Sequence, residues 1–413
     1  MELKKLEIGK FKNQDLTPNF RSPISFLGGI LCLFFVKFIY YNSDHHLFTG
    51  IIRHHRFCLE ANEKAKMKLF STVLPYLLLV SFYSGQINNF GIDKIRAINE
   101  SPYNGVAVPL IGAYDTGKYD EKDFEPAVKL IKKESKKHTW PWVFFNRFIG
   151  YKEGERSLSP MTKTKYFQSI KGMDIYNESE ALEDFKNIWR MSLKIAKELG
   201  SPGIVIDAEA YNNYKNYQLS YLVRQIDKPE EEIKKRLKEI GAEFVEIAEK
   251  EYPEATLWFL FTGLGSPQYR TVTYIIQGML ERAKEKGSKL KFVSGGELWG
   301  YCYESLDDLK ETIKKRNASF SDVIAKYPNL YLGGTIAPWN DVNLKKEGYF
   351  TKGKCGRSKL KTIEDFKPLI AQLLKSYQYV WIYAAKMVGY DPYNLDVSSA
   401  YSKTIGELIS GSH

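Results

Sequence analysis

The chain has 413 residues, of which 44% are hydrophobic and 26% are charged. These fractions are close to globular averages and exclude wholesale disorder and collagen-like structure, while the length suffices for one large domain or two ordinary ones. The net charge of +11 comes from lysines spread along the chain, so we expect a solvated basic surface and no nucleic-acid partner. Four cysteines are too few for a disulfide framework.

Histidine is the most restrictive residue type. The chain has six, and His138 is the only one between residues 67 and 412. That part of the chain therefore has no multi-histidine zinc site, and a serine or cysteine triad would depend on His138 alone. The segment 112–119 nearly fits a phosphate-binding loop, but Tyr119 replaces the required Ser or Thr. We therefore expect acid–base chemistry by carboxylates, with no metal and no cofactor.

Residues 1–66 are predicted to form an N-terminal extension to a main domain of residues 67–413. Within the extension, residues 22–41 form an apolar stretch of membrane-spanning length, with lysines ahead of it as in a cytoplasmic flank. Two interpretations remain open. A signal anchor here would make the protein membrane-anchored or secreted. Alternatively, Met67 is a plausible start, so that residues 1–66 are not part of the working protein and the protein is cytoplasmic.

Short apolar runs alternate with longer amphipathic stretches from residue 75 onward. Continuous apolar runs of this length are typical of strands covered on both faces, as in parallel sheets. There are eight: 75–82, 104–111, 139–146, 203–209, 255–262, 289–295, 329–336 and 377–384. The clearest helical patterns between them are 121–136, 179–199, 228–251, 267–287, 304–326 and 363–376. Eight strands alternating with helices predict an α/β fold, the (β/α)8 or TIM barrel.

The first of these strands has a competing interpretation. Residues 67–84 resemble a secretory signal, because Lys68 precedes an apolar core. Cleavage after this segment would remove the first strand and leave seven. The strand count therefore favours the strand over the signal.

A (β/α)8 barrel carries its chemistry at the carboxyl ends of its strands. The fourth run ends in Asp207 and Glu209, which are two residues apart and so share one face of a strand. Two carboxylates this close disfavour joint ionisation, so that one stays protonated near neutral pH while the other stays charged. Glu297 follows two glycines after the sixth run. We predict Glu209, Glu297 and Asp207 as catalytic residues; ion-paired or capping carboxylates are the alternative.

Aromatic and polar residues flank these carboxylates at neighbouring strand ends. Aromatic residues make up 14% of the chain, and flat rings with polar edges suit the faces of sugars. For Tyr211, Trp299 and Tyr301, ordinary packing explains the residue equally well. The predicted substrate-binding residues are Trp140, Trp142, Asn146, Arg147, Tyr211, Trp299, Tyr301 and Trp339.

The segment 203–209, Gly-Ile-Val-Ile-Asp-Ala-Glu, resembles the fourth-strand signature Asp-x-x-Asp-x-Asp-x-Glu of chitinase-like glycoside hydrolases. Asp207 and Glu209 match the final Asp-x-Glu, whereas Pro202 and Val205 stand in place of the first two aspartates. The resemblance implies that Glu209 is the general acid and that Asp207 assists it. The two departures argue against the family's route, in which the substrate's acetamido group is the nucleophile.

These features predict a glycoside hydrolase that acts on a poly- or oligosaccharide. Glu209 would protonate the leaving oxygen, Glu297 would be the nucleophile or base, and Asp207 would tune Glu209. The alternative is a non-catalytic carbohydrate-binding barrel displayed on a membrane anchor, which needs the aromatic cleft but no paired carboxylates. Carbohydrate is the expected partner in both cases.

Overall fold

The structure is a computed structural model. It describes residues 77–81, 86–112, 117–145, 175–176, 180–208, 218–265, 270–300, 303, 305–337, 362–383 and 395–410. These residues belong to one compact unit, Pro75–His413. The predicted extension and the apolar stretch 22–41 lie outside the described residues. Among the helices of the described ranges, none has both the length and the apolar character needed to cross a bilayer.

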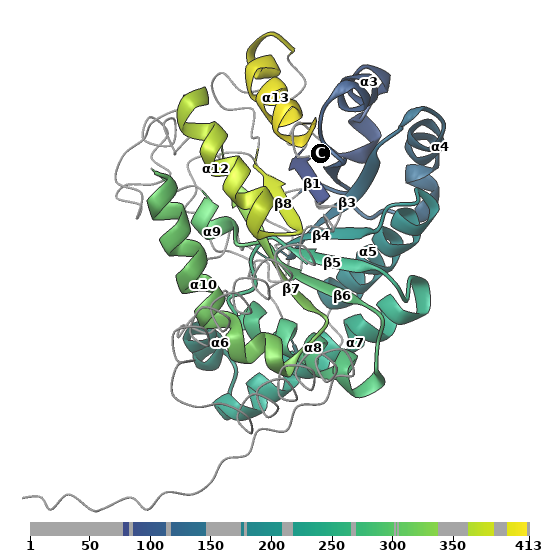
Figure 1. Cartoon of the computed structure of the whole chain (residues 1–413). Helices are drawn as coiled ribbons and strands as arrows, with labels where there is room; N and C mark the ends of the chain where they lie inside the picture. The colour runs from purple at the N-terminus through teal and green to yellow at the C-terminus, as the bar shows by residue number, and fades with distance from the viewer. Residues whose placement is uncertain are drawn as a thin grey trace, which may run out of the picture. The chain divides into compact units, whose positions relative to one another are not determined.

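Eight parallel strands close into a barrel in chain order, and β8 pairs with β1 (Figure 1). The strands are β1 Leu77–Ser81, β2 Gly105–Pro109, β3 His138–Phe144, β4 Gly203–Asp207, β5 Thr256–Phe259, β6 Lys291–Ser294, β7 Leu330–Ile336 and β8 Tyr379–Ile382. Each coincides with one of the eight apolar runs, apart from small differences at the ends. The predicted (β/α)8 barrel is therefore confirmed.

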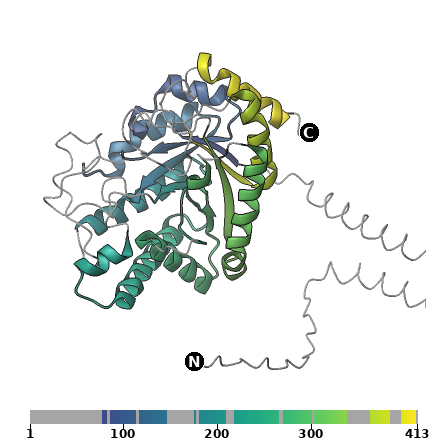
Figure 2. The same cartoon turned by 90° about the vertical axis from the view of Figure 1, so that its left-hand side faces the viewer.

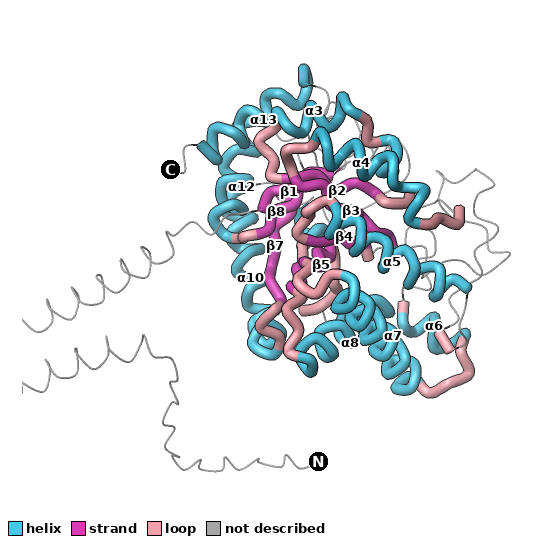
Figure 3. The backbone as a smooth tube through the Cα atoms, turned by 90° about the vertical axis from the view of Figure 1, so that its right-hand side faces the viewer, coloured by secondary structure: helices cyan, strands magenta, loops and turns pink. Residues whose placement is uncertain are grey.

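Helices enclose the barrel on its outer side (Figures 2 and 3). The six predicted helical patterns correspond to η2 with α4, and to α5, α7, α8, α10 and α12. The described helices are η1 Ile87–Asn89, α3 Ile92–Glu100, η2 Glu121–Phe124, α4 Glu125–Glu134, α5 Glu180–Glu198, α6 Leu219–Gln225, α7 Glu230–Glu251, α8 Thr271–Lys286, α9 Glu297–Gly300, α10 Leu306–Lys326, α12 Ile363–Ser376 and α13 Leu395–Ser410.

The helix start and stop signals in the sequence act as their chemistry predicts. The Ser305 side chain accepts a hydrogen bond from the amide of Asp308 at the start of α10, and Thr362 does the same for Asp365 at the start of α12. Asp120 forms a capping box at the start of η2. Gly287 ends α8 in the left-handed conformation, with φ 61°.

The alternation of side chains along the strands produces two apolar cores. One set of alternate positions packs outward against the helices; it includes Ile204 and Ile206. The other set fills the barrel interior: Leu79, Ala107, Trp140, Trp142, Phe144, Val205, Trp258, Leu260, Val293, Tyr379 and Trp381. Because Val205 belongs to the interior set, Asp207, two residues further along β4, faces the interior as well.

Candidate active site

Buried polar side chains gather where the strands end. Ser81, Asp207 and Ser294 are the last residues of β1, β4 and β6, and each is at most 2% exposed. The same end of the barrel also holds three further buried polar residues: Thr262, Glu297 and Thr335. Apolar strands that end in buried polar groups are the expected pattern for the functional mouth of such a barrel.

Asp207 is the carboxylate that β4 delivers to this mouth. Its side chain is fully buried, and it pairs in register with Phe144 of β3, a member of the interior core. A buried carboxylate is costly unless other groups satisfy it. Its position at the end of β4 agrees with the prediction, whereas Glu209 lies outside the described residues.

Glu297 comes from the turn that follows β6. Glu297 is the first residue of the short helix α9, and it is 2% exposed. Gly296 has φ 79°, a left-handed conformation that glycine adopts without a steric penalty. Gly296 therefore allows the sharp turn that places Glu297 after β6.

The backbones that carry Asp207 and Glu297 are joined through one residue of the segment after β5. The amide of Leu260 donates to the carbonyl of Ile206 at 2.9 Å, and the carbonyl of Leu260 accepts from the amide of Glu297 at 3.0 Å. The backbones at Asp207 and Glu297 are therefore two strand spacings, or about 10 Å, apart across the sheet. Both buried carboxylates thus belong to the same end of the barrel.

Hydroxyl groups fasten the strand ends around Glu297. The Oγ1 atom of Thr262 and the Oγ atom of Ser294 are 3.0 Å apart, which joins the ends of β5 and β6. The Thr335 hydroxyl donates to the carbonyl of Gly295 at 3.0 Å, which joins β7 to the same turn. These bonds hold Glu297 on a well-defined backbone, as a catalytic carboxylate requires.

Two of the predicted sugar-stacking residues lie inside the barrel. Trp140 is fully buried and contacts Trp258 edge to face at 5.8 Å between ring centroids. Trp142 is 1% exposed and packs against Phe144 at 4.9 Å and Trp381 at 5.5 Å. Trp140 is the third residue of β3, in the half of the strand away from the mouth. Trp140 therefore packs inside the barrel, well before the carboxyl end of β3.

The other predicted site residues are only partly described. Trp299 belongs to α9, two residues after Glu297, but its side chain lies outside the description. The described residues do not include the other five at all: Asn146, Arg147, Tyr211, Tyr301 and Trp339. Their predicted contacts with substrate stay predictions.

The structure also identifies residues that the sequence did not single out. Arg316 of α10 is 6% exposed and reaches the carbonyls of Ser294 and Gly333. Nothing in the sequence distinguishes this arginine from the many basic residues of the surface helices. Trp258 could not have been identified as an interior residue either, because the fifth run is apolar at both sets of alternate positions.

Among the described residues, no three His, Cys, Asp or Glu side chains form a cluster that could hold a metal ion.

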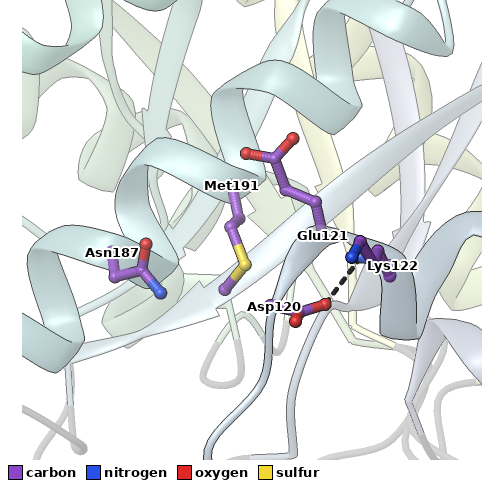
Figure 4. A pocket seen from close by; sticks show the side chains of 5 residues that line it. All are labelled: Asp120, Glu121, Lys122, Asn187 and Met191. Atoms are coloured by element: carbon purple, nitrogen blue, oxygen red, sulfur yellow. Dashed lines mark hydrogen bonds between the residues drawn. The ribbon is translucent and has the colours of Figure 1, made fainter.

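A hollow on the outer wall lies between η2 and α5 (Figure 4). Asp120, Glu121, Lys122, Asn187 and Met191 line it. The Asp120 carboxylate there accepts from the amide of Lys122 at 2.9 Å, so it already serves as a helix cap. The mouth is therefore the better candidate site.

No protein-family model matches the chain, and no curated protein sequence matches it. Several solved structures are similar to it at low sequence identity. A broad-specificity endoglucanase of subfamily GH5-4 from an uncultured bacterium has a TM-score of 0.48 and 10% identity, with 83% of this chain and 95% of that chain covered.

Two other structures have a similarly low sequence identity to this chain. A glycoside hydrolase family 5 enzyme from Prevotella bryantii B14 has a TM-score of 0.45 and 11% identity, covering 82% of this chain and 97% of that chain. A D-psicose 3-epimerase has a TM-score of 0.35 and 9% identity, covering 81% and 98%. No residue role follows from likenesses at this level.

Proposed function

We propose that this protein hydrolyses glycosidic bonds in a poly- or oligosaccharide. The observation that carries the proposal is the placement of Asp207 and Glu297, two buried carboxylates that flank β5 at the mouth of the barrel. Glycoside hydrolysis requires a pair of carboxyl groups on opposite sides of the scissile bond. Buried carboxylates also have the environment in which protonated and ionised forms can coexist near neutral pH.

In the proposed mechanism, Glu209 donates a proton to the leaving oxygen. Its neighbour Asp207 tunes the protonation of Glu209, because like charges close together disfavour joint ionisation. Glu297 either attacks the sugar carbon or activates a water molecule. A carboxyl separation of about 5 Å would give retention of configuration, and one of roughly 6.5–9.5 Å would give inversion.

In this proposal, the aromatic and polar residues predicted around the mouth bind the sugar. Trp299 is one candidate, because it follows Glu297 by two residues in the segment after β6. Trp339, Tyr211, Tyr301, Asn146 and Arg147 complete the proposed set. Trp142 can contribute from the floor of the site, whereas Trp140 is assigned to the core.

The test is a hydrolysis screen across soluble glycans of different sugars and linkages. The wild-type chain is compared with Glu209→Gln and Glu297→Gln, which keep the side-chain shape and remove the acid or nucleophile. Glu254→Gln is the matched control, because Glu254 lies before the amino end of β5, at the opposite end of the barrel, and its side chain is 69% exposed. We expect turnover in the wild type and the control, and at least a thousandfold loss in the other two variants.

Binding of a glycan without turnover would instead favour the non-catalytic carbohydrate-binding barrel. In that case, the Glu209→Gln and Glu297→Gln variants would bind the glycan as tightly as the wild type does. Equal turnover in the wild type and all three variants would show that Glu209 and Glu297 are not the catalytic carboxylates.

We further propose that the protein is membrane-anchored or secreted, on the strength of the apolar stretch 22–41 and the lysines before it. Fractionation of cells that express the full chain tests this. Intact protein in the soluble cytoplasmic fraction would rule out the anchor. A fragment that begins near Met67 would instead show that residues 1–66 are not part of the working protein.

A further inference from the structure

A buried guanidinium group lies directly behind the turn that carries Glu297. Arg316 is 6% exposed, although it comes from α10, a helix of the outer layer. A fully buried charge is retained only where other groups compensate for the lost solvation. Its described hydrogen bonds go to two main-chain carbonyls, of Ser294 and Gly333.

The place where Arg316 binds is the point at which β6 and β7 separate. Register between these strands ends at the pair Ser294 and Leu332. Beyond it, the backbone of residues 295–297 follows β5 instead: Gly295 donates to the carbonyl of Phe259 at 2.7 Å, and Glu297 donates to that of Leu260 at 3.0 Å. The main-chain ladder between β6 and β7 therefore no longer holds this side of the turn. Side chains hold it instead: the Thr335 hydroxyl bonds to Gly295, and Arg316 bonds to both strands.

Gly296 shows how closely the guanidinium approaches the turn. A Cβ atom built on Gly296 would lie 2.6 Å from the Cζ atom of Arg316, so a side chain at this position would displace the arginine. The rings of Phe320 and Tyr377 lie 5.7 and 5.4 Å from the same Cζ atom and fix the guanidinium from its other sides. Gly296 is therefore required both for its φ of 79° and for the space that Arg316 occupies.

We propose that Arg316 is a positioning residue for Glu297, acting as a clamp that fixes the turn of residues 295–297 at the point where β6 leaves β7. A planar guanidinium holds two carbonyls with a rigid fork of donors, whereas a lysine ammonium is a single point on a flexible stem and does not fix their geometry in this way. The clamp itself follows from the contacts; its effect on turnover rests on the proposed glycosidase function.

Hydrogen exchange of the full chain, followed by mass spectrometry on peptides that cover residues 293–300, tests the clamp without any substrate. The variants are Arg316→Met, which keeps the length and apolar stem, and Arg316→Lys, which also keeps the charge. We expect exchange at Gly295 and Glu297 to become at least tenfold faster in Arg316→Met. The exchange rate in Arg316→Lys should lie between those of Arg316→Met and the wild type. If Arg316→Met does not fold, Arg316→Lys alone is compared with the wild type.

Arg236→Met is the matched control. Arg236 also binds a main-chain carbonyl, that of Ile175 at 2.7 Å, but it lies on α7 and pairs with Glu243 at 2.8 Å. Its loss should leave exchange in residues 293–300 unchanged. Unchanged exchange in the Arg316 variants, or equal acceleration in Arg236→Met, would overturn the clamp.

Kinetics on an active glycan test the effect on Glu297. We expect kcat to fall at least tenfold in Arg316→Met, with KM within about twofold, because Arg316 lies behind the turn and not in the sugar site. A changed KM with unchanged kcat would overturn the positioning role. If the wild type hydrolyses no glycan, the proposed function fails on its own, and the exchange experiment alone decides whether Arg316 fixes the turn.

Discussion

The hydroxyl of Thr335 donates a hydrogen bond to the carbonyl of Gly295 at 3.0 Å, so that β7 holds the turn after β6 by a side chain. Both residues are buried. The bond matters because the ladder between β6 and β7 has already ended at Ser294. A carbonyl at that position has lost its strand partner and needs another donor.

Replacing Thr335 by Val keeps the shape and removes this donor. We expect the free energy of unfolding to fall by about 1–3 kcal/mol, because the buried carbonyl of Gly295 is left without its hydroxyl partner. Thr335→Ser is the control, since it keeps the hydroxyl and loses only a methyl group. Denaturant titration followed by circular dichroism measures both. A Thr335→Val variant as stable as Thr335→Ser would show that the hydrogen bond is not important for stability.

The fold could be predicted from the sequence because its signal is repeated eight times. Each strand is buried on both faces, so it reads as a short apolar run, and the amphipathic helices separate the runs cleanly. The short α9 could not be predicted, because four residues are too few to show a helical period. The helices α3 and α13 were also missed. They lie side by side in the structure, where Tyr103, just after α3, contacts Ser402 of α13 at 3.3 Å.

The site was predicted less completely than the fold. Polar residues that interrupt an apolar run are visible in the sequence, so the position of Asp207 at the end of β4 could be predicted. Arg316 could not be found, because its role depends on where β6 and β7 separate in space and not on its neighbours in α10. Trp140 was predicted at the mouth, whereas its ring is fully buried in the interior core; burial of this kind cannot be read from a run that is apolar on both faces.

Gly278 is predicted to be essential for the packing of α7 against α8. A Cβ atom at this position would lie 2.0 Å from the carbonyl oxygen of Lys238, which belongs to the backbone of α7 and cannot move alone. The higher helix propensity of alanine, worth about 1 kcal/mol, is outweighed by the separation of the two helices. We therefore expect Gly278→Ala to lower the free energy of unfolding by about 2 kcal/mol or more.

Gly91 provides the control for this substitution. It precedes α3 with φ −76°, and no atom lies within 4 Å of the position where its Cβ would be. Gly91→Ala should cost no more than about 1 kcal/mol, because the only penalty is that alanine is a poorer N-cap of α3 than glycine. Thermal and denaturant unfolding of both variants measure the difference. Equal stability of the two would contradict the close approach of the helices at Gly278.

Glu243 is predicted to make stability depend on pH. Burial acts to raise the pKa of Glu243, but its interactions with Lys186 and Arg236, each at 2.8 Å, outweigh burial and hold the pKa below its usual value. A carboxyl whose pKa is lower in the folded state stabilises the fold above the pKa of the unfolded chain. That contribution disappears as the pH falls through the folded-state pKa.

The stability difference between the wild type and Glu243→Gln should therefore be clear at pH 7 and shrink toward pH 3. Denaturant titrations at several pH values measure it. Glu254→Gln is again the control, because an exposed pair such as Glu254 and Lys289 contributes little at any pH. A difference that stays constant between pH 7 and pH 3 would show that the charge of Glu243 is not what stabilises the fold.

The substitution Trp140→Phe tests whether the ring of Trp140 packs in the core or binds sugar. In the structure its ring is fully buried and contacts Trp258 edge to face, so Trp140→Phe should lower the free energy of unfolding by about 1–3 kcal/mol through lost contact and a small cavity. On a glycan that the wild type hydrolyses, KM should stay within about twofold. Trp299→Phe is the comparison, because Trp299 lies beside Glu297 on α9; there KM should rise while stability changes less. If Trp140→Phe raised KM as much as Trp299→Phe, the ring of Trp140 would have to reach substrate, and its assignment to the core would be wrong.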